Sequence, residues 1–146
     1  MSRSTHILFG VILIAAIKTA SAEPQTNVAA TSAAPSAPSS LLFYFDSGSA
    51  TVRPKDTALL DQASRLYREG KPIVMIVSGS ADATGSAASN LQLSQRRALN
   101  VLRGLVSRGI PIERFQVVAK GETDPAVPTT PGVAEERNRS VELTWR

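Results

Sequence analysis

The sequence has 146 residues, 42% of them hydrophobic, which suits one compact domain with a core and is short for two. It contains no cysteine, and its one histidine, His6, lies in an amino-terminal segment that we expect to be removed. These absences exclude a Ser-His-Asp triad, a cysteine nucleophile and a zinc site of imidazole or thiolate ligands. We therefore expect a binding module rather than an enzyme, with no metal and no small-molecule cofactor.

Residues 1–22 have the pattern of a secretory signal peptide. A basic start precedes an apolar stretch at residues 7–17, and the small residues 20–22 form a cleavage site. A membrane-spanning helix needs about 20 apolar residues, and Lys18 interrupts this stretch early. We expect cleavage after Ala22, and the alternative is an uncleaved membrane anchor.

A linker follows the signal peptide at residues 23–40. Of its 18 residues, 14 are Ala, Ser, Thr or Pro, without an apolar period that could form a core. Once the signal peptide is removed, 14 of the 16 basic residues remain against 12 acidic ones, so the net charge falls to about +2. This small charge gives little reason to propose a nucleic-acid partner. The folded domain is therefore expected at residues 41–146.

The domain begins with a predicted strand and a predicted helix. Residues 41–45 are apolar and aromatic, as in a buried strand. Pro54 suits the first turn of a helix, and apolar residues then recur on one helical face as far as residue 67. Gly70 and Pro72 end this helix.

A second strand and a longer helix follow. Residues 73–77 form a continuous apolar run of mostly β-branched side chains, which predicts a central strand covered on both faces. After a turn rich in Gly, Ser and Ala, a helix is predicted from about residue 86 to 108, and Gly109 stops it. Its predicted apolar stripe consists of Leu91, Ala98, Val101, Leu102, Leu105 and Val106.

Two further strands, at residues 115–121 and 140–145, complete the pattern, joined by a long loop rich in Pro and Thr. The order is therefore β-α-β-α-β-β. Strands linked by helices lie parallel through right-handed crossovers, whereas the closing strand can pair antiparallel. These elements predict an α/β two-layer sandwich, with two helices packed on a mixed four-stranded sheet.

The candidate functional residues lie where the second strand meets the second helix. Asp82 is in the turn after that strand, at the edge where open α/β sheets often bind ligands. Asn90, Ser94 and Arg97 follow at i, i+4 and i+7, which places them along one side of the helix. Arg97 is predicted at the border of the apolar stripe and partly shielded, while three neighbours are assigned to a solvated face: Arg96, Asn100 and Arg103.

A carboxylate and a guanidinium that face one cavity match the two charges of a zwitterion. Asp82 would bind an ammonium group, and Arg97 would bind a carboxylate through paired N–H groups. The small residues Gly79, Ala81 and Gly85 leave room for a ligand and for exposed backbone N–H groups. The alternative is a plain salt bridge between Asp82 and Arg97 that fixes the turn to the helix.

Several motifs occur in a fixed order within this domain. The second helix contains the pattern Asn90-x-x-Leu93-Ser94-x-x-Arg97-Ala98-x-x-Val101-x-x-x-Leu105. The flanking motifs are Phe45-Asp46 with Ser49-Ala50 and Pro54, then Gly121-Glu122, then Asn138-Arg139-x-Val141-Glu142. Together they resemble the OmpA-like peptidoglycan-binding domain, the carboxy-terminal domain of OmpA, Pal and MotB proteins. The resemblance covers residues 41–145.

This resemblance implies a role for each candidate residue. Asp82 and Arg97 would hold the free amino and carboxyl groups of meso-diaminopimelate in the peptidoglycan stem peptide. Asn90 would position the turn and the helix start near the ligand, and Ser94 would line the same side. Arg139 would add a second cation or brace Asp82 from the last strand. For Asn90 and Arg139 the alternative is a purely structural role.

Two positions depart from the pattern of that family. Ser80 and Ala81 stand where the family usually has histidine and threonine before the acid, and Ser140 stands where it usually has a second arginine. The acid and the helix arginine are both kept. We therefore expect the departures to affect the affinity or the ligand preference rather than to remove the site.

The function implied by the resemblance is non-enzymatic binding of peptidoglycan in the bacterial cell envelope. The domain would be exported to the periplasm and could associate with the outer membrane, with other envelope proteins as further partners. Two alternatives stay open. One is an OmpA-like fold with weakened or lost peptidoglycan binding that acts as a structural or protein-interaction module, and the other is a membrane-anchored stator or tether that retains residues 7–17.

Overall fold

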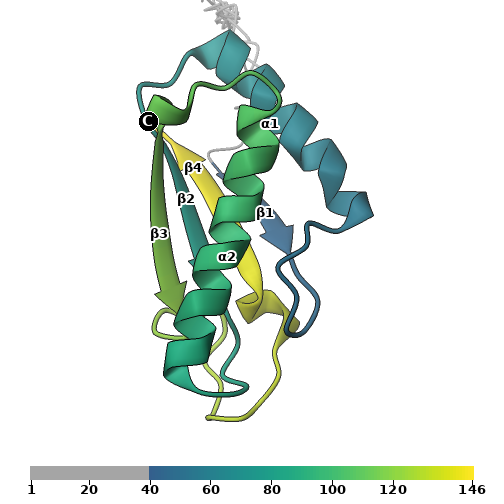
Figure 1. The fold of residues 1–146 in the computed structure, drawn as a ribbon, viewed down its shortest axis with the longest axis vertical. Helices are drawn as coiled ribbons and strands as arrows, with labels where there is room; N and C mark the ends of the chain where they lie inside the picture. Colours follow the sequence, from purple (N-terminus) through teal and green to yellow (C-terminus); the bar gives the residue numbers. More distant parts are fainter. Residues whose placement is uncertain (1–39) are drawn as a thin grey trace, which may run out of the picture. The chain divides into compact units, whose positions relative to one another are not determined.

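Residues 40–146, the part of the chain that the computed structural model describes, contain four strands and two longer helices (Figure 1). In chain order they are β1 (Ser40–Tyr44), α1 (Thr57–Gly70), β2 (Met75–Ser80), α2 (Ala87–Val106), β3 (Phe115–Gly121) and β4 (Ser140–Trp145). Short 3-10 helices are η1 (Pro54–Asp56), η2 (Ile112–Arg114) and η3 (Glu136–Asn138). The predicted signal peptide, and the linker up to residue 39, lie outside the described residues.

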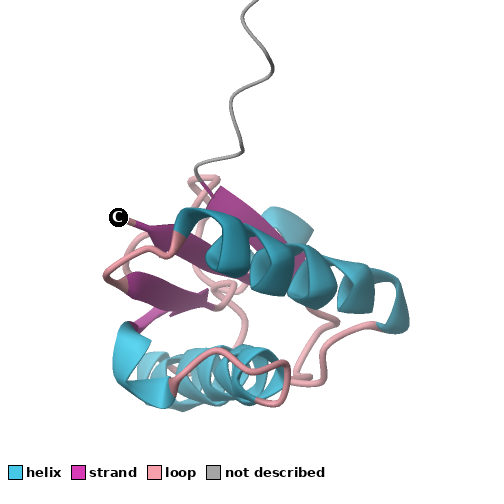
Figure 2. Ribbon diagram, turned by 90° about the horizontal axis from the view of Figure 1, so that it is seen from above, coloured by secondary structure: helices cyan, strands magenta, loops and turns pink. Residues whose placement is uncertain are grey.

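The four strands form one mixed sheet in the order β1-β4-β2-β3. β2 and β3, which α2 connects, pair in parallel, and β4 is antiparallel to both β1 and β2. The last strand of the chain therefore lies between the first two. This arrangement, with α1 and α2 packed on the sheet (Figure 2), confirms the predicted β-α-β-α-β-β order and the predicted fold class.

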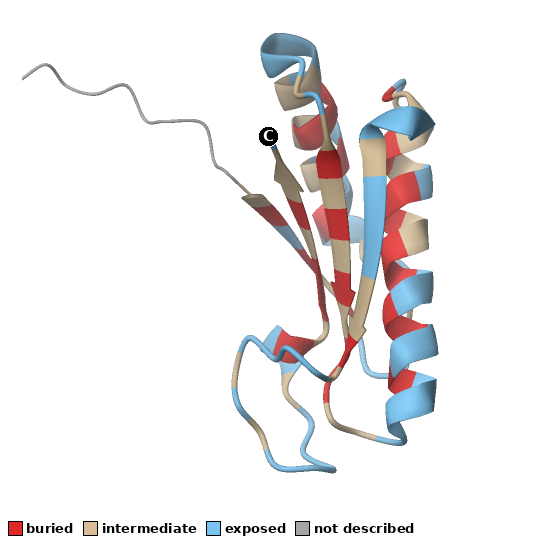
Figure 3. Ribbon diagram, turned by 90° about the vertical axis from the view of Figure 1, so that its left-hand side faces the viewer, coloured by how far each residue is buried: buried red, intermediate tan, exposed pale blue. Residues whose placement is uncertain are grey.

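The core fills the space between the helices and one face of the sheet. Alternate residues of β2 are buried and only partly buried, a banding that can be followed along the strand in Figure 3. The fully or largely buried apolar residues of the core are Leu41, Phe43, Phe45, Leu60, Ala63, Met75, Val77, Ala98, Val101, Leu105, Ile110, Val141 and Leu143. The opposite face of the sheet is open, so the expectation of a central strand covered on both faces was wrong.

The second strand also begins later than the apolar run indicated. Ile73 is 74% exposed and β2 starts at Met75. The reason lies in the end of α1, because Lys71 caps this helix in the left-handed conformation, with φ of 44°, and the chain then needs several residues to reach the sheet. The backbone N–H groups of Ile73 and Val74 both donate to the carbonyl of Arg146 on this approach.

Near its start, helix α2 buries a different face from the predicted one. Leu91 is 49% exposed, whereas Leu93 is buried. The prediction for Leu91 was wrong because the core-facing positions of the first turns belong to Asn90, Ser94 and Arg97, and Leu91 points about 100° away from Asn90. Three polar side chains therefore occupy positions that normally hold apolar ones. Within residues 40–146, no helix is long and apolar enough to span a membrane.

Candidate functional site

Asp82 follows β2 directly, and its side chain is held on both carboxylate oxygens. It is only 2% exposed, Oδ2 accepts a hydrogen bond from Arg139 Nη1 at 3.0 Å, and Oδ1 accepts one from Thr84 Oγ1 at 2.7 Å. Burial raises the pKa of Asp82, but the hydrogen bonds from Thr84 and Arg139 and the charge of Arg139 outweigh it. The pKa therefore lies below its usual value, and Asp82 is a carboxylate at neutral pH.

Arg97 is a fully buried cation, with 0% of its surface exposed. Its three nitrogens each donate to a backbone carbonyl: Nε to Ser49 at 2.8 Å, Nη1 to Ser80 at 3.0 Å and Nη2 to Asp46 at 3.1 Å. The guanidinium carbon also lies 5.3 Å from the centre of the Phe45 ring, within reach of a cation–π interaction. The turn after β1 therefore closes over Arg97, which was predicted to be only partly shielded.

The structure places Asp82 and Arg97 near one another without joining them. No ion pair between them occurs within residues 40–146; Asp82 pairs with Arg139 instead. Burial lowers the pKa of Arg97 to about 10, the charge of Asp82 raises it, and the charge of Arg139 lowers it again. The alternative of a plain Asp82–Arg97 salt bridge is therefore wrong, because Asp82 pairs with Arg139 and the Arg97 nitrogens donate to backbone carbonyls.

Asn90 and Ser94 connect the start of α2 to the end of β3. The Asn90 side-chain amide donates to the Glu122 carboxylate, and both Asn90 and Ser94 are buried. Ser94 Oγ donates to the carbonyl of Leu91 at 2.8 Å and accepts from the backbone N–H of Gly121 at 3.0 Å. These hydrogen bonds fix the helix against the strand end beside the Asp82 turn.

The two glycines predicted to shape the turn differ in what they do. Gly79 lies where β2 and α2 touch, and a Cβ there would be 2.1 Å from the carbonyl oxygen of Ser94. Gly85 has φ of +94°, a left-handed conformation that side chains rarely adopt. The helix then begins after Ser86, whose side chain accepts a hydrogen bond from the N–H of Ser89.

Sequence reasoning missed the turn of residues 46–50 as a part of this site. Asn100, predicted on the solvated face of α2, donates from Nδ2 to the Ala50 carbonyl at 2.8 Å. With the two hydrogen bonds from Arg97, this contact holds both ends of the turn to α2. Two signals were present in the sequence: the motif Phe45-Asp46 with Ser49-Ala50, and Gly48, which has φ of +67° and marks a turn; backbone carbonyl acceptors themselves leave no sequence pattern.

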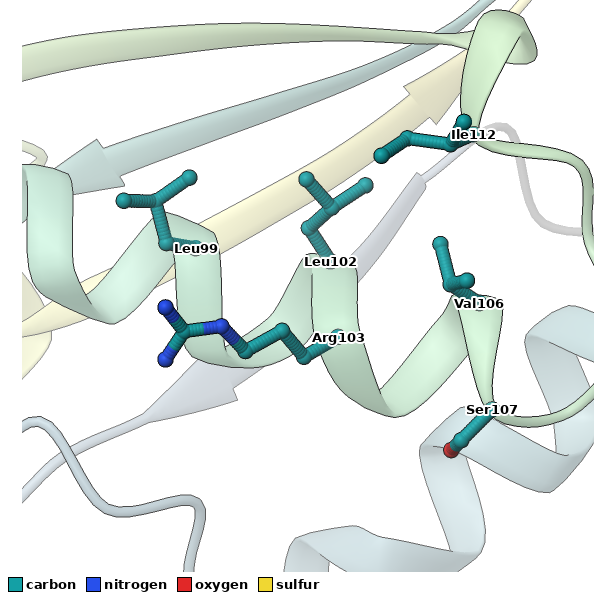
Figure 4. A pocket seen from close by; sticks show the side chains of 6 residues that line it. All are labelled: Leu99, Leu102, Arg103, Val106, Ser107 and Ile112. Atoms are coloured by element: carbon teal, nitrogen blue, oxygen red, sulfur yellow. The ribbon is translucent and has the colours of Figure 1, made fainter.

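Three cavities on residues 40–146 are lined by residues other than Asp82 and Arg97. One cavity of about 410 Å³ lies on the side of α2 (Figure 4) and is mostly apolar, lined by Leu99, Leu102, Arg103, Val106, Ser107 and Ile112. Two others are lined by different residues, again without Asp82 or Arg97. Residues 40–146 also contain no cluster of acidic side chains that could hold a metal ion. Asp82 and Arg97 are thus both buried, and each is hydrogen-bonded within the domain.

The fold is a two-layer α/β domain in which a carboxylate after β2 and a guanidinium on α2 are both buried. The chain belongs to the OmpA family, whose sequence profile matches residues 44–139. This confirms the resemblance inferred from the motifs. Domains of this family are structural binding modules and not enzymes, as the residue content had indicated.

Individual relatives agree with this assignment. The chain is 35% identical over 100 residues to "Outer membrane protein A" of Bordetella avium, covering 68% of this chain and 52% of the relative. It is 31% identical over 100 residues to "Probable lipoprotein YiaD" of Escherichia coli K12, covering 68% and 46%. It thus spans about half the length of these curated relatives. The crystal structure of the peptidoglycan-associated lipoprotein from Burkholderia pseudomallei superposes with a TM-score of 0.67 at 27% identity, over 72% of this chain and 89% of that one.

Proposed function

We propose that residues 40–146 bind peptidoglycan non-covalently in the bacterial cell envelope, on the periplasmic side of the outer membrane. Family membership supports this proposal, as does the likeness to a solved peptidoglycan-associated lipoprotein. The observation that carries it is the fully buried Arg97, which has no ion-pair partner within the described residues and lies next to the Asp82 carboxylate. A buried charge without a counter-ion destabilises a fold, so a chain that keeps one is expected to use it for function.

The hydrogen bonds of Arg97 indicate how a ligand carboxylate would bind. Nε and Nη2 lie on one edge of the planar guanidinium, and that edge presents two parallel N–H groups to a carboxylate. In the structure, the Ser49 and Asp46 carbonyls occupy this edge. The ligand carboxylate would replace these two carbonyls as the 46–50 turn moves outward, while Nη1 stays on Ser80. In the absence of a ligand, the two carbonyls of the turn thus accept the hydrogen bonds that a ligand carboxylate would accept.

Asp82 can accept a ligand ammonium while it keeps its internal partners. A carboxylate offers about four lone-pair positions, and here Thr84 and Arg139 use two of them. Arg139 braces the carboxylate from the start of β4 and fixes its orientation. Asp82 and Arg97 together would therefore hold the free amino and carboxyl groups of diaminopimelate in the stem peptide.

The other predicted site residues would position this pair. Asn90 and Ser94 hold α2 against the end of β3, and Gly79 allows β2 to approach α2 closely. Gly85 provides the backbone conformation of the turn that leads into the helix. Small displacements of any of these elements would change the separation between the ammonium and carboxylate positions of the ligand.

Binding of the full chain to purified sacculi tests the proposal. We expect Asp82→Asn to weaken co-sedimentation by tenfold or more, because a hydrogen bond to a charged group contributes about 1.5–3 kcal/mol. Arg97→Lys should weaken it similarly, since lysine cannot present a planar pair of N–H groups. Arg96→Lys, on the exposed side of the same helix, is the matched control. Circular dichroism must show that each variant is folded.

Unchanged sedimentation of a folded Asp82→Asn variant would refute the two-point site. Failure of the parent chain itself to sediment with sacculi would favour the second candidate function, a protein-interaction module that keeps the fold and has lost the ligand. The closed state of Arg97 and the apolar cavity beside α2 are the observations that favour this candidate.

A further inference from the structure

The open face of the sheet carries a second cavity, away from the closed Asp82 site. Its volume is about 260 Å³, and nine residues from all four strands and the β3–β4 loop line it: Leu42, Ser78, Ser80, Lys120, Asp124, Pro125, Ala126, Ser140 and Glu142. The cavity beside α2 is mostly apolar, whereas this one is lined by three serines and three charged side chains as well as by aliphatic ones. Such a mixture can orient a polar ligand as well as bury it.

Strand pairing places one carboxylate in the middle of the cavity floor. Glu142 on β4 is paired with Leu42 on one side and with Ser78 on the other. Ser140, two residues before Glu142 on the same face, adds a hydroxyl, and Ser80 adds another from β2. Within residues 40–146, Glu142 takes part in no ion pair, so its carboxylate oxygens are available as hydrogen-bond acceptors.

The wall of the cavity is the first part of the β3–β4 loop, and it is held in place at two points. Lys120 Nζ pairs with Asp124 Oδ2 at 2.7 Å. The buried Asn138 accepts from the N–H of Val127 at 2.8 Å and donates to the carbonyl of the same residue at 2.7 Å. Residues 125–126, between these two points, form an aliphatic rim opposite the strand residues. The cavity is therefore built from fixed elements on each side.

The chemistry of the lining selects a neutral ligand with several hydroxyl groups. Lys120 and Asp124 neutralise each other, so the remaining charge is that of Glu142, which repels anions and accepts hydrogen bonds from O–H groups. Serine hydroxyls can donate or accept, and the aliphatic rim can cover C–H groups. The volume lies just below the range of about 300–1,000 Å³ for sites that enclose a whole small-molecule ligand. It fits one unit of a longer polymer.

We propose that this cavity binds a sugar unit of the peptidoglycan glycan strand, an N-acetylhexosamine ring. The proposal rests on the proposed function, and it adds a second contact point on the other face of the sheet. Both sites share two segments of the chain. Ser80 lines the cavity, and its backbone carbonyl accepts a hydrogen bond from Arg97. Ser140 also lines the cavity and directly follows Arg139, which pairs with Asp82. Stem peptide and sugar would thus be held at the same end of the sheet.

The experiment titrates the full chain with an N-acetylglucosamine oligomer that carries no peptide, followed by amide NMR shifts and calorimetry. We expect the shifts to centre on Ser78 and Glu142. Glu142→Gln should weaken binding about tenfold, because it replaces a charged acceptor of almost the same shape. Ala126→Trp should abolish binding by filling the cavity, and its exposed position makes the variant compatible with folding.

Two matched controls belong to this experiment. Glu113→Gln removes an exposed carboxylate outside the cavity, and Ala134→Trp adds the same bulk elsewhere in the β3–β4 loop. Both should bind the oligomer like the parent chain. Absence of binding by the parent chain, or binding that neither Glu142→Gln nor Ala126→Trp weakens, would overturn the proposal.

A parallel titration with a diaminopimelate-containing stem peptide separates this proposal from the proposed function. The peptide should bind Ala126→Trp normally and Asp82→Asn weakly. Binding of the peptide without binding of the sugar oligomer overturns the cavity proposal and leaves the peptide site standing. Binding of the oligomer alone, sensitive to Glu142→Gln, supports the sugar site while the two-point peptide site fails.

Discussion

Replacing Gly79 by alanine is a direct test of the close contact between β2 and α2. The added Cβ would lie 2.1 Å from the carbonyl oxygen of Ser94 and 3.2 Å from Cβ of Ala98. Real Cβ contacts are essentially never shorter than 3.0 Å, so strand and helix must separate by about 1 Å. The obstructing atom belongs to the helix backbone, and no side-chain rotation can relieve the contact.

The expected loss of stability follows from this displacement. Overpacking a well-packed interior typically costs about 1–3 kcal/mol. Separation of the two elements would also strain the hydrogen bonds that Ser94 makes to Gly121 and that Arg97 makes to Ser80. We therefore expect the free energy of unfolding to fall by about 3 kcal/mol. For a domain of this size, the melting temperature should fall by roughly 10–20 °C.

Urea denaturation and thermal melts followed by circular dichroism measure this change, with two other glycines as controls. Gly70, at the end of α1, has no atom within 4 Å of an added Cβ, so Gly70→Ala should change stability by less than about 1 kcal/mol. Gly104→Ala should be intermediate, because its Cβ would meet a flexible Leu60 methyl group at 2.8 Å. A Gly79→Ala variant as stable as Gly70→Ala would refute the reasoning.

Two more predictions concern the loop and the buried acid. Asn138→Ala should lower the free energy of unfolding by about 2 kcal/mol, because it removes two hydrogen bonds to Val127. Hydrogen exchange at the Val127 amide should accelerate, and an unchanged exchange rate would contradict this prediction. The pKa of Asp82 is lowered in the folded state, so its contribution to stability is present above the ordinary carboxyl pKa and is lost as pH falls through the lowered value. As the pH falls from neutral to about 3, the free energy of unfolding should therefore fall less for Asp82→Asn than for the parent chain, as measured by urea titrations. Identical pH profiles of the two proteins would rule out this role of Asp82.

Much of the fold could be predicted because hydrophobic periodicity is strong in most elements. The strands at 115–121 and 140–145 occur where the pattern placed them. The second strand was misjudged because an apolar run cannot distinguish a strand from the segment that leads into it. Its real pattern continues through Ser78 and Ser80, which alternate with Val77 and Gly79 and face the open side. The alternation is visible in the sequence once residues 78–80 are included with the apolar run at residues 73–77.

The candidate site could be predicted in part. Helical spacing alone was enough to place Asn90, Ser94 and Arg97 on one side of α2, and the structure buries all three. The partners of Arg97 could not be predicted, because they are backbone carbonyls of a turn about 50 residues away in the chain. The pairing of Asp82 with Arg139 was one of two open alternatives, and only the strand order of the sheet decides between them.

The central position of β4 determines when this domain can fold. β4 pairs with β1 on one side and with β2 on the other, so a chain that ends before Ser140 leaves β1 without a strand partner. Contacts such as Ser40 with Thr144 join opposite ends of the domain, and their formation requires closure of a very long loop. The pairing of β1 in the sheet therefore requires that β4 has been synthesised. A chain that lacks β4 cannot complete the sheet, and the unpaired strand edge and exposed apolar residues of such a chain favour aggregation.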